Sequence, residues 1–173
     1  AEYFKVHKPH NTLLFIAFDA EEMGLQGAYA FLKDPVISRK SIIMNVNVDM
    51  VSHNDKSELY AVGTFKTPIL KEIIEDADDN TGINILFGHD IPGSGKDDWT
   101  MQSDQGPFAK ENIPFIYFGV EDHEDYHKPT DKFATINQNY FHSASITILK
   151  SILKIDKDLN KIKANTTDSL KTK

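Results

Sequence analysis

The sequence contains no cysteine among its 173 residues, which excludes disulfide bonds and thiolate metal ligands. It also lacks any apolar run approaching the ~20 residues needed to cross a bilayer, so we expect no membrane insertion. Positive charge is scarce as well, because the net charge is −7, and this argues against a nucleic acid as the main partner. A hydrophobic content of 40% is nevertheless enough to bury a core. These features predict one globular domain, or a large part of one.

Strand-like and helix-like segments alternate along the chain, which predicts an α/β fold with a mixed, mostly parallel sheet and helices on both faces. The expected strands are 12–18, 41–49, 57–63, 83–88 and 114–118, and the expected helices are 24–33, 67–80, 103–111 and 136–160. The short turn 52–57 suits a hairpin, so one strand pair is expected to be antiparallel. We assign residues 1–160 to a single domain and the polar stretch 161–173 to a disordered tail.

Two adjacent carboxylates, Glu21 and Glu22, follow the first expected strand at its carboxyl end. In open α/β sheets this is the edge at which ligands bind. Neighbouring residues point in different directions, so one carboxylate can hold a cation while the other takes a proton from bound water. The alternative is a pair of solvated acids at the start of a helix, where the helix dipole favours them. Only partners elsewhere in the chain can decide between the two.

Possible partners follow two further strands. Asp49 comes after the apolar run 41–48 and would emerge beside Glu21 and Glu22 if the strands are parallel, although Asp is also a common turn former. His127 lies in the loop after the strand 113–118, where a lone histidine would usually be solvated. Carboxylates and an imidazole at three strand ends would together suit zinc or a related divalent ion.

Four ordered motifs carry a resemblance to a known enzyme family. They are FDAEEMGLQGA (18–28), NVDM (47–50), SDQGPF (103–108) followed by Ile113-Pro114, and YHKPTD (126–131). In this order and spacing they resemble the co-catalytic dizinc exopeptidases of the bacterial leucyl aminopeptidase type, over about Leu13 to Phe133. The resemblance implies a zinc-exopeptidase-like fold. It also implies hydrolysis of the first peptide bond of a peptide substrate with a free amino terminus.

The resemblance further implies two Zn²⁺ ions and a role for each matched residue. Glu21 would be the general base, Glu22 and His127 would bind one zinc ion, and Asp49 would bind the other. Tyr126 resembles a tyrosine that stabilises the tetrahedral oxyanion in some members, with a simple packing role as the alternative. Because the family is commonly exported, the resemblance also implies a periplasmic or secreted protein.

The chain departs from the family upstream of these motifs. Family members carry there one more zinc-ligand His and a bridging Asp in a Gly-Ala-Asp-Asp-Asn-like stretch, and nothing before Thr12 matches it. His7 and His10 stand on the wrong side of the expected strand to replace them. We therefore expect the carboxyl-terminal part of a longer enzyme, whose missing amino-terminal part supplies the other ligands. The isolated chain should then be inactive.

A second zinc motif competes, because residues 123–127 match H-E-x-x-H. That signature works only on a helix, where positions four apart share a face. Acidic neighbours crowd the stretch and Pro129 pushes Lys128 out of the helical region, so we expect His123 in a solvated loop.

Two other functions remain open from the sequence. One is a glutaminyl-cyclase-like transferase, which shares this scaffold with a single zinc ion, although the stretch 23–28 resembles the peptidases more closely. The other is a peptidase-like binding module without metal, against which the joint presence of Glu21, Glu22, Asp49 and His127 argues. The irregular loop 89–102 either shapes a substrate pocket or is a solvated connection, and Ser103 and Asp104 either serve the site or only open a helix.

Overall fold

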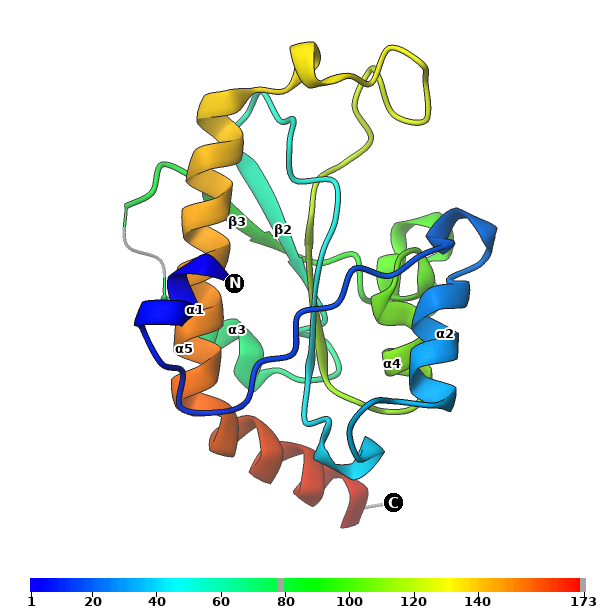
Figure 1. Cartoon of the computed structure of the whole chain (residues 1–173), viewed down its shortest axis with the longest axis vertical. Helices are drawn as coiled ribbons and strands as arrows, with labels where there is room; N and C mark the ends of the chain where they lie inside the picture. The colour runs from blue at the N-terminus through cyan, green and yellow to red at the C-terminus, as the bar shows by residue number, and fades with distance from the viewer. Residues whose placement is uncertain (78–79, 172–173) are drawn as a thin grey trace.

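A four-stranded sheet forms the centre of the protein (Figure 1). The structure, a computed structural model, describes residues 1–77 and 80–171, with side chains as far as residue 165. The strand order is β1 (Asn45–Val48), β4 (Phe115–Gly119), β2 (Glu58–Val62) and β3 (Asn84–Phe87). The pairs β1/β4 and β2/β3 are parallel and β2/β4 is antiparallel, so the predicted mixed, mostly parallel sheet is confirmed.

The antiparallel pair is not the one that the sequence predicts. β1 and β2 do not form a hairpin across the turn 52–57, because β4 lies between them. All five residues of β4 are buried, as expected for an inner strand of a sheet that helices cover on both faces. β4 therefore occupies an inner position, with Val62 of β2 opposite Tyr117.

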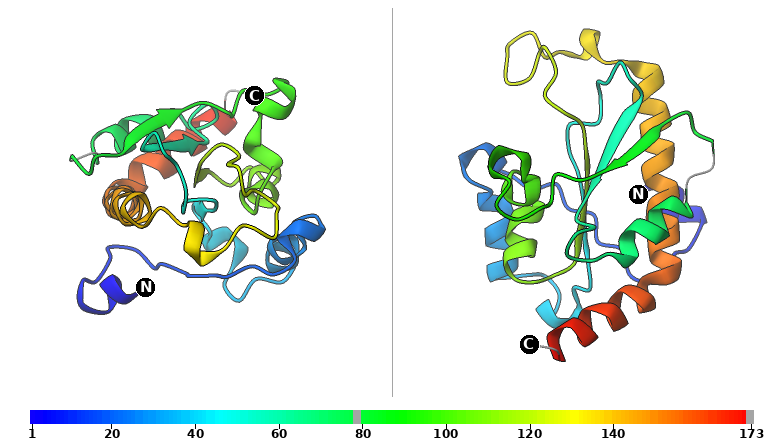
Figure 2. Two further views of the ribbon diagram at one scale, coloured as in Figure 1. Left: turned by 90° about the horizontal axis from the view of Figure 1, so that it is seen from above. Right: turned by 180° about the vertical axis from the view of Figure 1, so that it is seen from behind.

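Helices cover both faces of the sheet, as predicted (Figures 1 and 2). α3 (Ile69–Glu75) and α5 (Gln138–Lys171) pack on one face, where Ile116 and Phe118 of β4 join the main core. The other face carries α2 (Gln26–Lys33) and α4 (Gln105–Lys110), with Phe115 and Tyr117 of β4 turned toward a second cluster. This alternation of β4 side chains is the two-residue period of a strand. A short helix, α1 (Glu2–Val6), precedes these elements.

The first predicted strand is wrong, since 12–18 is extended but pairs with no strand of the described sheet. Three of its apolar side chains remain 40–56% exposed: Leu14, Phe15 and Ile16. The pattern predicted extended backbone correctly, but a strand also needs a partner's backbone. The segment is instead fixed before residue 12, where both carboxylate oxygens of Asp156 on α5 accept backbone N–H groups, from His10 at 2.7 Å and Asn11 at 2.8 Å.

α5 is longer than the predicted helix 136–160. It continues to Lys171 through most of the segment expected to be a disordered tail, and Ile162 within that segment is fully buried. Its first turn is capped by Asn137, whose Oδ1 accepts the backbone N–H of Tyr140 at 3.0 Å. Within the part of the chain that the structure describes, no helix is apolar over enough length to span a membrane.

Candidate metal centre

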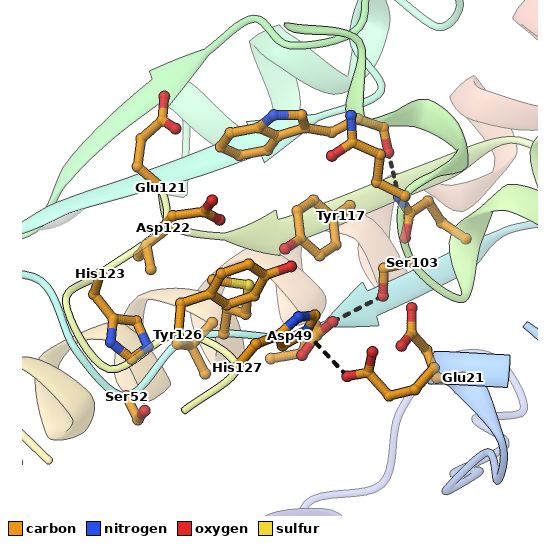
Figure 3. A pocket seen from close by; sticks show the side chains of 18 of the residues that line it. Glu21, Asp49, Ser52, Ser103, Tyr117, Glu121, Asp122, His123, Tyr126 and His127 are labelled. Carbon is orange, nitrogen blue, oxygen red and sulfur yellow. Dashed lines mark hydrogen bonds and ion pairs between the residues drawn. The ribbon is translucent and has the colours of Figure 1, made fainter. Parts of the chain in front are cut away.

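The five residues singled out from the sequence line one pocket of about 1050 Å³: Glu21, Glu22, Asp49, Tyr126 and His127 (Figure 3). They come from three connections, which follow the extended segment 12–18, β1 and β4. Because β1 and β4 are parallel, their carboxyl ends meet at the same edge of the sheet, which is where ligands bind in such folds.

The side chains of Glu22 and His127 meet directly. Oε1 of Glu22 lies 3.2 Å from Nε2 of His127, and both side chains are more than half exposed toward the pocket side. His127 has a left-handed backbone with φ +54°, which costs about 1 to 3 kcal/mol for a residue with a Cβ. Such strained positions concentrate at functional sites, so the backbone supports a role for this histidine beyond packing.

A tight turn presents the two glutamates. Glu21–Met23 is a single turn of 3₁₀ helix, and the residues Ala20 and Leu25 on either side are both left-handed, at φ +55° and +59°. The turn closes against the chain before it, where the N–H of Gly27 donates to the carbonyl of Asp19 at 3.0 Å. A Cβ at position 27 would lie 2.3 Å from that carbonyl oxygen, so only glycine permits this approach.

Asp49 is held by a chain of hydrogen bonds. Its N–H donates to the carbonyl of Phe118 at 3.1 Å, which continues the β1/β4 ladder. Its Oδ2 accepts the hydroxyl of Ser103 at 2.9 Å, and Ser103 in turn accepts Nδ2 of Asn47 at 2.9 Å. The same Nδ2 donates to Oε1 of Gln105 at 2.8 Å. One carboxylate oxygen of Asp49 is thus fixed, and the other is left for a ligand.

The sequence analysis did not predict this chain of hydrogen bonds. Ser103 does more than open a helix, since its hydroxyl orients Asp49. The signal that could have found it is Asn47, a polar residue within the predicted strand 41–49, two positions before Asp49 and therefore on the same face.

Negative charge is concentrated in the pocket. Desolvation raises the pKa of Glu21, and the neighbouring carboxylates of Glu22, Asp49 and Asp104 raise it further, while His127 lowers it. The pKa of Asp104 is also raised, first by desolvation and then by Asp49, and its Oδ1 is buried with no hydrogen-bond partner. Crowded carboxylates of this kind are stabilised by a cation.

Two tyrosines, Tyr117 and Tyr126, line the same pocket as the carboxylates. Tyr126 stacks on the imidazole of His127, with 3.9 Å between ring centroids, and desolvation followed by the charge of Asp122 raises its pKa. Tyr117 is buried, and desolvation followed by the charge of Asp49 raises its pKa as well. Both hydroxyls therefore stay protonated at neutral pH and can donate hydrogen bonds.

The loop 89–102 forms a wall of the pocket, as one of the two sequence interpretations expected. Its residues Lys96, Trp99, Met101 and Gln102 line the pocket. The ring of His89 lies flat on Trp99, with 3.8 Å between centroids. Its two nitrogens face carboxylates, Nδ1 at 2.8 Å from Asp97 and Nε2 at 3.2 Å from Glu121. His89 thus joins the loop to the residues that follow β4.

The H-E-x-x-H segment is not helical, as predicted, and residues 124–127 form turns. His123 is not a solvated residue, however: it is half-buried and stacks on His53. His7 and His10 do not line the pocket, and His10 contacts Asp156 instead. The three residues predicted as metal ligands, Glu22, Asp49 and His127, therefore line one pocket, in which Glu22 contacts His127 directly. A set of two carboxylates and one imidazole fits zinc.

A family model and several solved structures resemble the chain. The model of peptidase family M28 matches residues 1–152. No curated protein sequence matches. A zinc aminopeptidase from Bacillus subtilis is 25% identical with a TM-score of 0.62, over 79% of this chain and 34% of that one.

Two further structures share the fold at lower identity. An aminopeptidase from Aneurinibacillus sp. strain AM-1 is 22% identical with a TM-score of 0.61, over 80% of this chain and 32% of that one. The LapA aminopeptidase of Legionella pneumophila is 16% identical with a TM-score of 0.61, over 82% and 38%. The chain thus spans about a third of the length of these proteins.

Proposed function

The chain belongs to peptidase family M28, and from this we propose that it forms the part of a zinc-dependent aminopeptidase that carries the general base and three metal ligands. The observation that carries the proposal is the contact between Glu22 and His127, at 3.2 Å, in the same pocket as Asp49. Three residues that lie far apart in the sequence supply zinc-type donors at one edge of the sheet.

We assign Glu22 and His127 to one zinc ion and Asp49 to a second. Zinc at this position would lower the pKa of a water molecule and polarise the carbonyl of the scissile peptide. Catalytic zinc ions usually have three protein ligands, and the described residues offer fewer than that for each of two ions. The remaining ligands, a histidine and a carboxylate shared by both ions, would then come from outside the described residues. We propose that the segment which supplies these ligands, a further part of the same protein, is the partner of the chain.

Glu21 would take the proton of the attacking water and return it to the leaving amine. Its side chain lines the pocket beside the ligand Glu22, and its position in the turn aims it differently from that ligand. A general base must be deprotonated, and the raised pKa of Glu21 brings it closer to neutral pH, where proton transfer in both directions is efficient.

Tyr126 would donate its hydroxyl hydrogen to the carbonyl oxygen as negative charge develops there. Its stacking on His127 fixes the ring beside the zinc ligands. A donor aimed at a developing oxyanion lowers the barrier because it interacts more strongly with the transition state than with the substrate.

We propose peptides with a free amino terminus as substrates. The pocket is lined by several carboxylates, among them Glu121 and Asp122, and this charge favours a cationic amine. Trp99 and Met101 offer apolar surface in the same pocket for a side chain of the substrate. A periplasmic or secreted location is proposed on the family resemblance alone.

Hydrolysis of leucine p-nitroanilide tests the proposal, measured with added zinc on this chain alone and on the longest product of its gene. We expect zinc-dependent release of nitroaniline from the longer product, abolished by a chelator and restored by zinc, and none from the chain alone. An inactive, zinc-loaded longer product would contradict the aminopeptidase assignment. Turnover by the chain alone would show that it contains every ligand it needs.

A further inference from the structure

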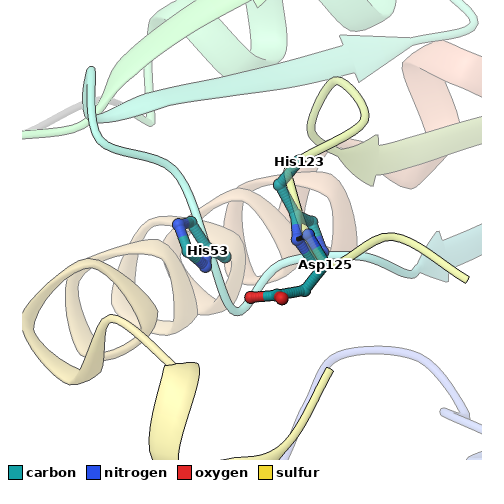
Figure 4. Close-up of side chains that lie close together, drawn as sticks. All are labelled: His53, His123 and Asp125. Atoms are coloured by element: carbon teal, nitrogen blue, oxygen red, sulfur yellow. Dashed lines mark hydrogen bonds between the residues drawn. The ribbon is translucent and has the colours of Figure 1, made fainter. Parts of the chain in front are cut away.

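The histidine rings of His53 and His123 lie face to face although they come from different loops (Figure 4). His53 belongs to the loop after β1 and His123 to the loop after β4. Their centroids are 5.0 Å apart and their planes differ by 6°. Both residues are half-buried, so each is constrained by its surroundings rather than free in solvent.

Carboxylates complete a polar cluster around the two rings. Asp125 is half-buried, and ligand atoms of His53, His123 and Asp125 all lie within 4.8 Å of one another. Asp55 adds a second carboxylate, with Oδ1 3.9 Å from Nε2 of His53. Two imidazole nitrogens with one or two carboxylate oxygens form a donor set typical of zinc, and no thiolate is needed.

This cluster is separate from the proposed dizinc centre. His123 reaches the rim of the pocket, but His53 and Asp125 are not among the residues that line it. None of the residues assigned to the dizinc centre belongs to the cluster. In Figure 3, His123 lies on the opposite side of Tyr126 from Glu21.

We propose that His53, His123 and Asp125 form a third metal site, which holds one divalent ion of the zinc class. The proposal does not depend on peptidase activity, since none of these three donors is assigned to the dizinc centre, and two of them, His53 and Asp125, do not line the catalytic pocket. Asp55 is the fourth side-chain ligand when the ion is bound, and water fills any remaining position.

Binding requires the two rings to turn. Parallel imidazoles direct their lone pairs along parallel planes, so their nitrogens converge on one ion only after rotation about the side-chain bonds. Nδ1 of His123 accepts the backbone N–H of Asp125 at 3.3 Å, which is a long contact and weak enough to give up. The ring environments should therefore change measurably when the ion binds.

The site would tie together the two loops that carry catalytic ligands. His53 follows Asp49 by four residues, and His123 precedes His127 by four. An ion shared by His53 and His123 would fix the distance between the loops and so hold Asp49 and His127 in register. Its role is positional, since none of its ligands touches the proposed reaction centre.

Calorimetric titration of the chelator-treated chain with Zn²⁺ tests the site, performed on a His127→Ala background that disables the proposed dizinc centre. We expect one ion to bind. A further His53→Ala or Asp125→Asn substitution should lower the affinity for zinc at least about tenfold, because even residues that only support a metal ligand change metal affinity by that much. His7→Ala is the matched control, because this exposed histidine follows α1, where its Nδ1 contacts the carbonyl of Tyr3, and it belongs neither to the cluster nor to the pocket. Equal binding by all variants, or no binding on the His127→Ala background, would overturn the proposal.

Nuclear magnetic resonance of the histidine rings in the unmutated chain gives a second readout that does not depend on any variant folding. Stoichiometric Zn²⁺ should shift the ring nitrogens of His53 and His123 together. Mg²⁺ should leave them unchanged, because it prefers an all-oxygen shell. Zinc-induced shifts confined to His127 would mean that the cluster binds no ion.

Discussion

The hydroxyl of Ser103 donates to Oδ2 of Asp49 at 2.9 Å, and this single contact sets the direction of a proposed zinc ligand. Ser103 is buried and is itself held by Asn47 at 2.9 Å. The ligand is thus oriented before any metal arrives, by residues from β1 and from the segment before α4.

Ser103→Ala should weaken metal binding without unfolding the protein. Loss of the hydroxyl frees the Asp49 carboxylate to rotate, and outer partners of this kind typically change metal affinity or activity by about 10-fold to 100-fold. Zinc titration of a protein containing the complete centre measures the effect. Ser145→Ala, which removes an exposed hydroxyl that bonds only within α5, should change nothing. An affinity equal to that of the unmodified protein would mean that the contact does not position Asp49.

Glu21→Gln should separate proton transfer from metal binding. The change removes a proton acceptor but keeps the side-chain shape, so the catalytic constant should fall by about 10²-fold to 10⁴-fold in an active enzyme that contains this chain. Zinc content, measured by atomic absorption, should stay near normal. Glu22→Gln is the matched comparison and should lower zinc content as well. A Glu21→Gln enzyme that keeps most of its activity would refute the assignment of the base.

Asp104→Asn should stabilise the metal-free chain at neutral pH. Desolvation and the charge of Asp49 raise the pKa of Asp104 above its ordinary value, so the folded state binds a proton more tightly than the unfolded state. The stability linked to this proton is complete below the unfolded pKa and is lost as pH rises through the folded pKa. The variant should therefore melt higher than the unmodified chain at pH 7, and the difference should shrink in acid. If the two proteins differed in melting temperature by the same amount at pH 7 and in acid, the charge of Asp104 would not be the cause of the difference.

Asp156→Asn should destabilise the fold by about 1 to 3 kcal/mol at neutral pH, because it replaces a buried carboxylate that accepts part-buried hydrogen bonds from His10 and Asn11 with an amide that has only one acceptor oxygen. Burial raises the pKa of Asp156, but the hydrogen bonds from His10 and Asn11 outweigh it and the net shift is downward. A lowered folded pKa contributes stability above the unfolded pKa, and this is lost as pH falls through the folded pKa. Urea unfolding curves of the two proteins should therefore converge in acid.

Glu75→Gln is the control for that measurement, since Glu75 makes only an exposed pair with Lys71 at 3.8 Å and such pairs contribute little. If Glu75→Gln and Asp156→Asn lower the free energy of unfolding by the same amount, the hydrogen bonds of Asp156 do not hold the amino-terminal segment.

The sequence predicts much of this fold because its signals are local. The apolar runs of β2, β3 and β4 are short and bounded by turn residues; β2 and β3 form within the predicted ranges, and β4 extends one residue beyond its range, to Gly119. The position of β4 between β1 and β2 is not a local property. The inner position of β4 becomes apparent only when the burial of all the strands is compared.

The segment 12–18 shows that a local signal can also predict a strand that does not form. Its residues have strong strand propensity, yet propensity fixes only the backbone conformation, while pairing depends on a free edge elsewhere. The site residues are less sensitive to this error. Glu21 and Glu22 reach the pocket because the turn after the segment is tight, whether or not the segment joins a sheet.

The neighbours of the site residues were harder to anticipate. Asn47 indicates that a polar partner is needed beside Asp49, but Ser103 is 56 positions away from Asn47 and nothing in the local sequence identifies it as that partner. The same holds for His123 and His53, the second of which the sequence analysis did not single out. Contacts between loops depend on the geometry of the whole sheet, so motif spacing alone cannot reveal them.

The close approach of Gly27 to Asp19 limits how the proposed site can be redesigned. A methyl group at position 27 would collide with the backbone that presents Glu21 and Glu22, so a library randomised across the turn should return glycine there whatever activity is selected. On the pocket wall formed by the loop 89–102, Trp99 is held by its ring contacts with His89 and Tyr117, whereas the side chain of Met101 is exposed. Directed evolution of substrate preference should therefore begin at Met101 and leave the turn untouched.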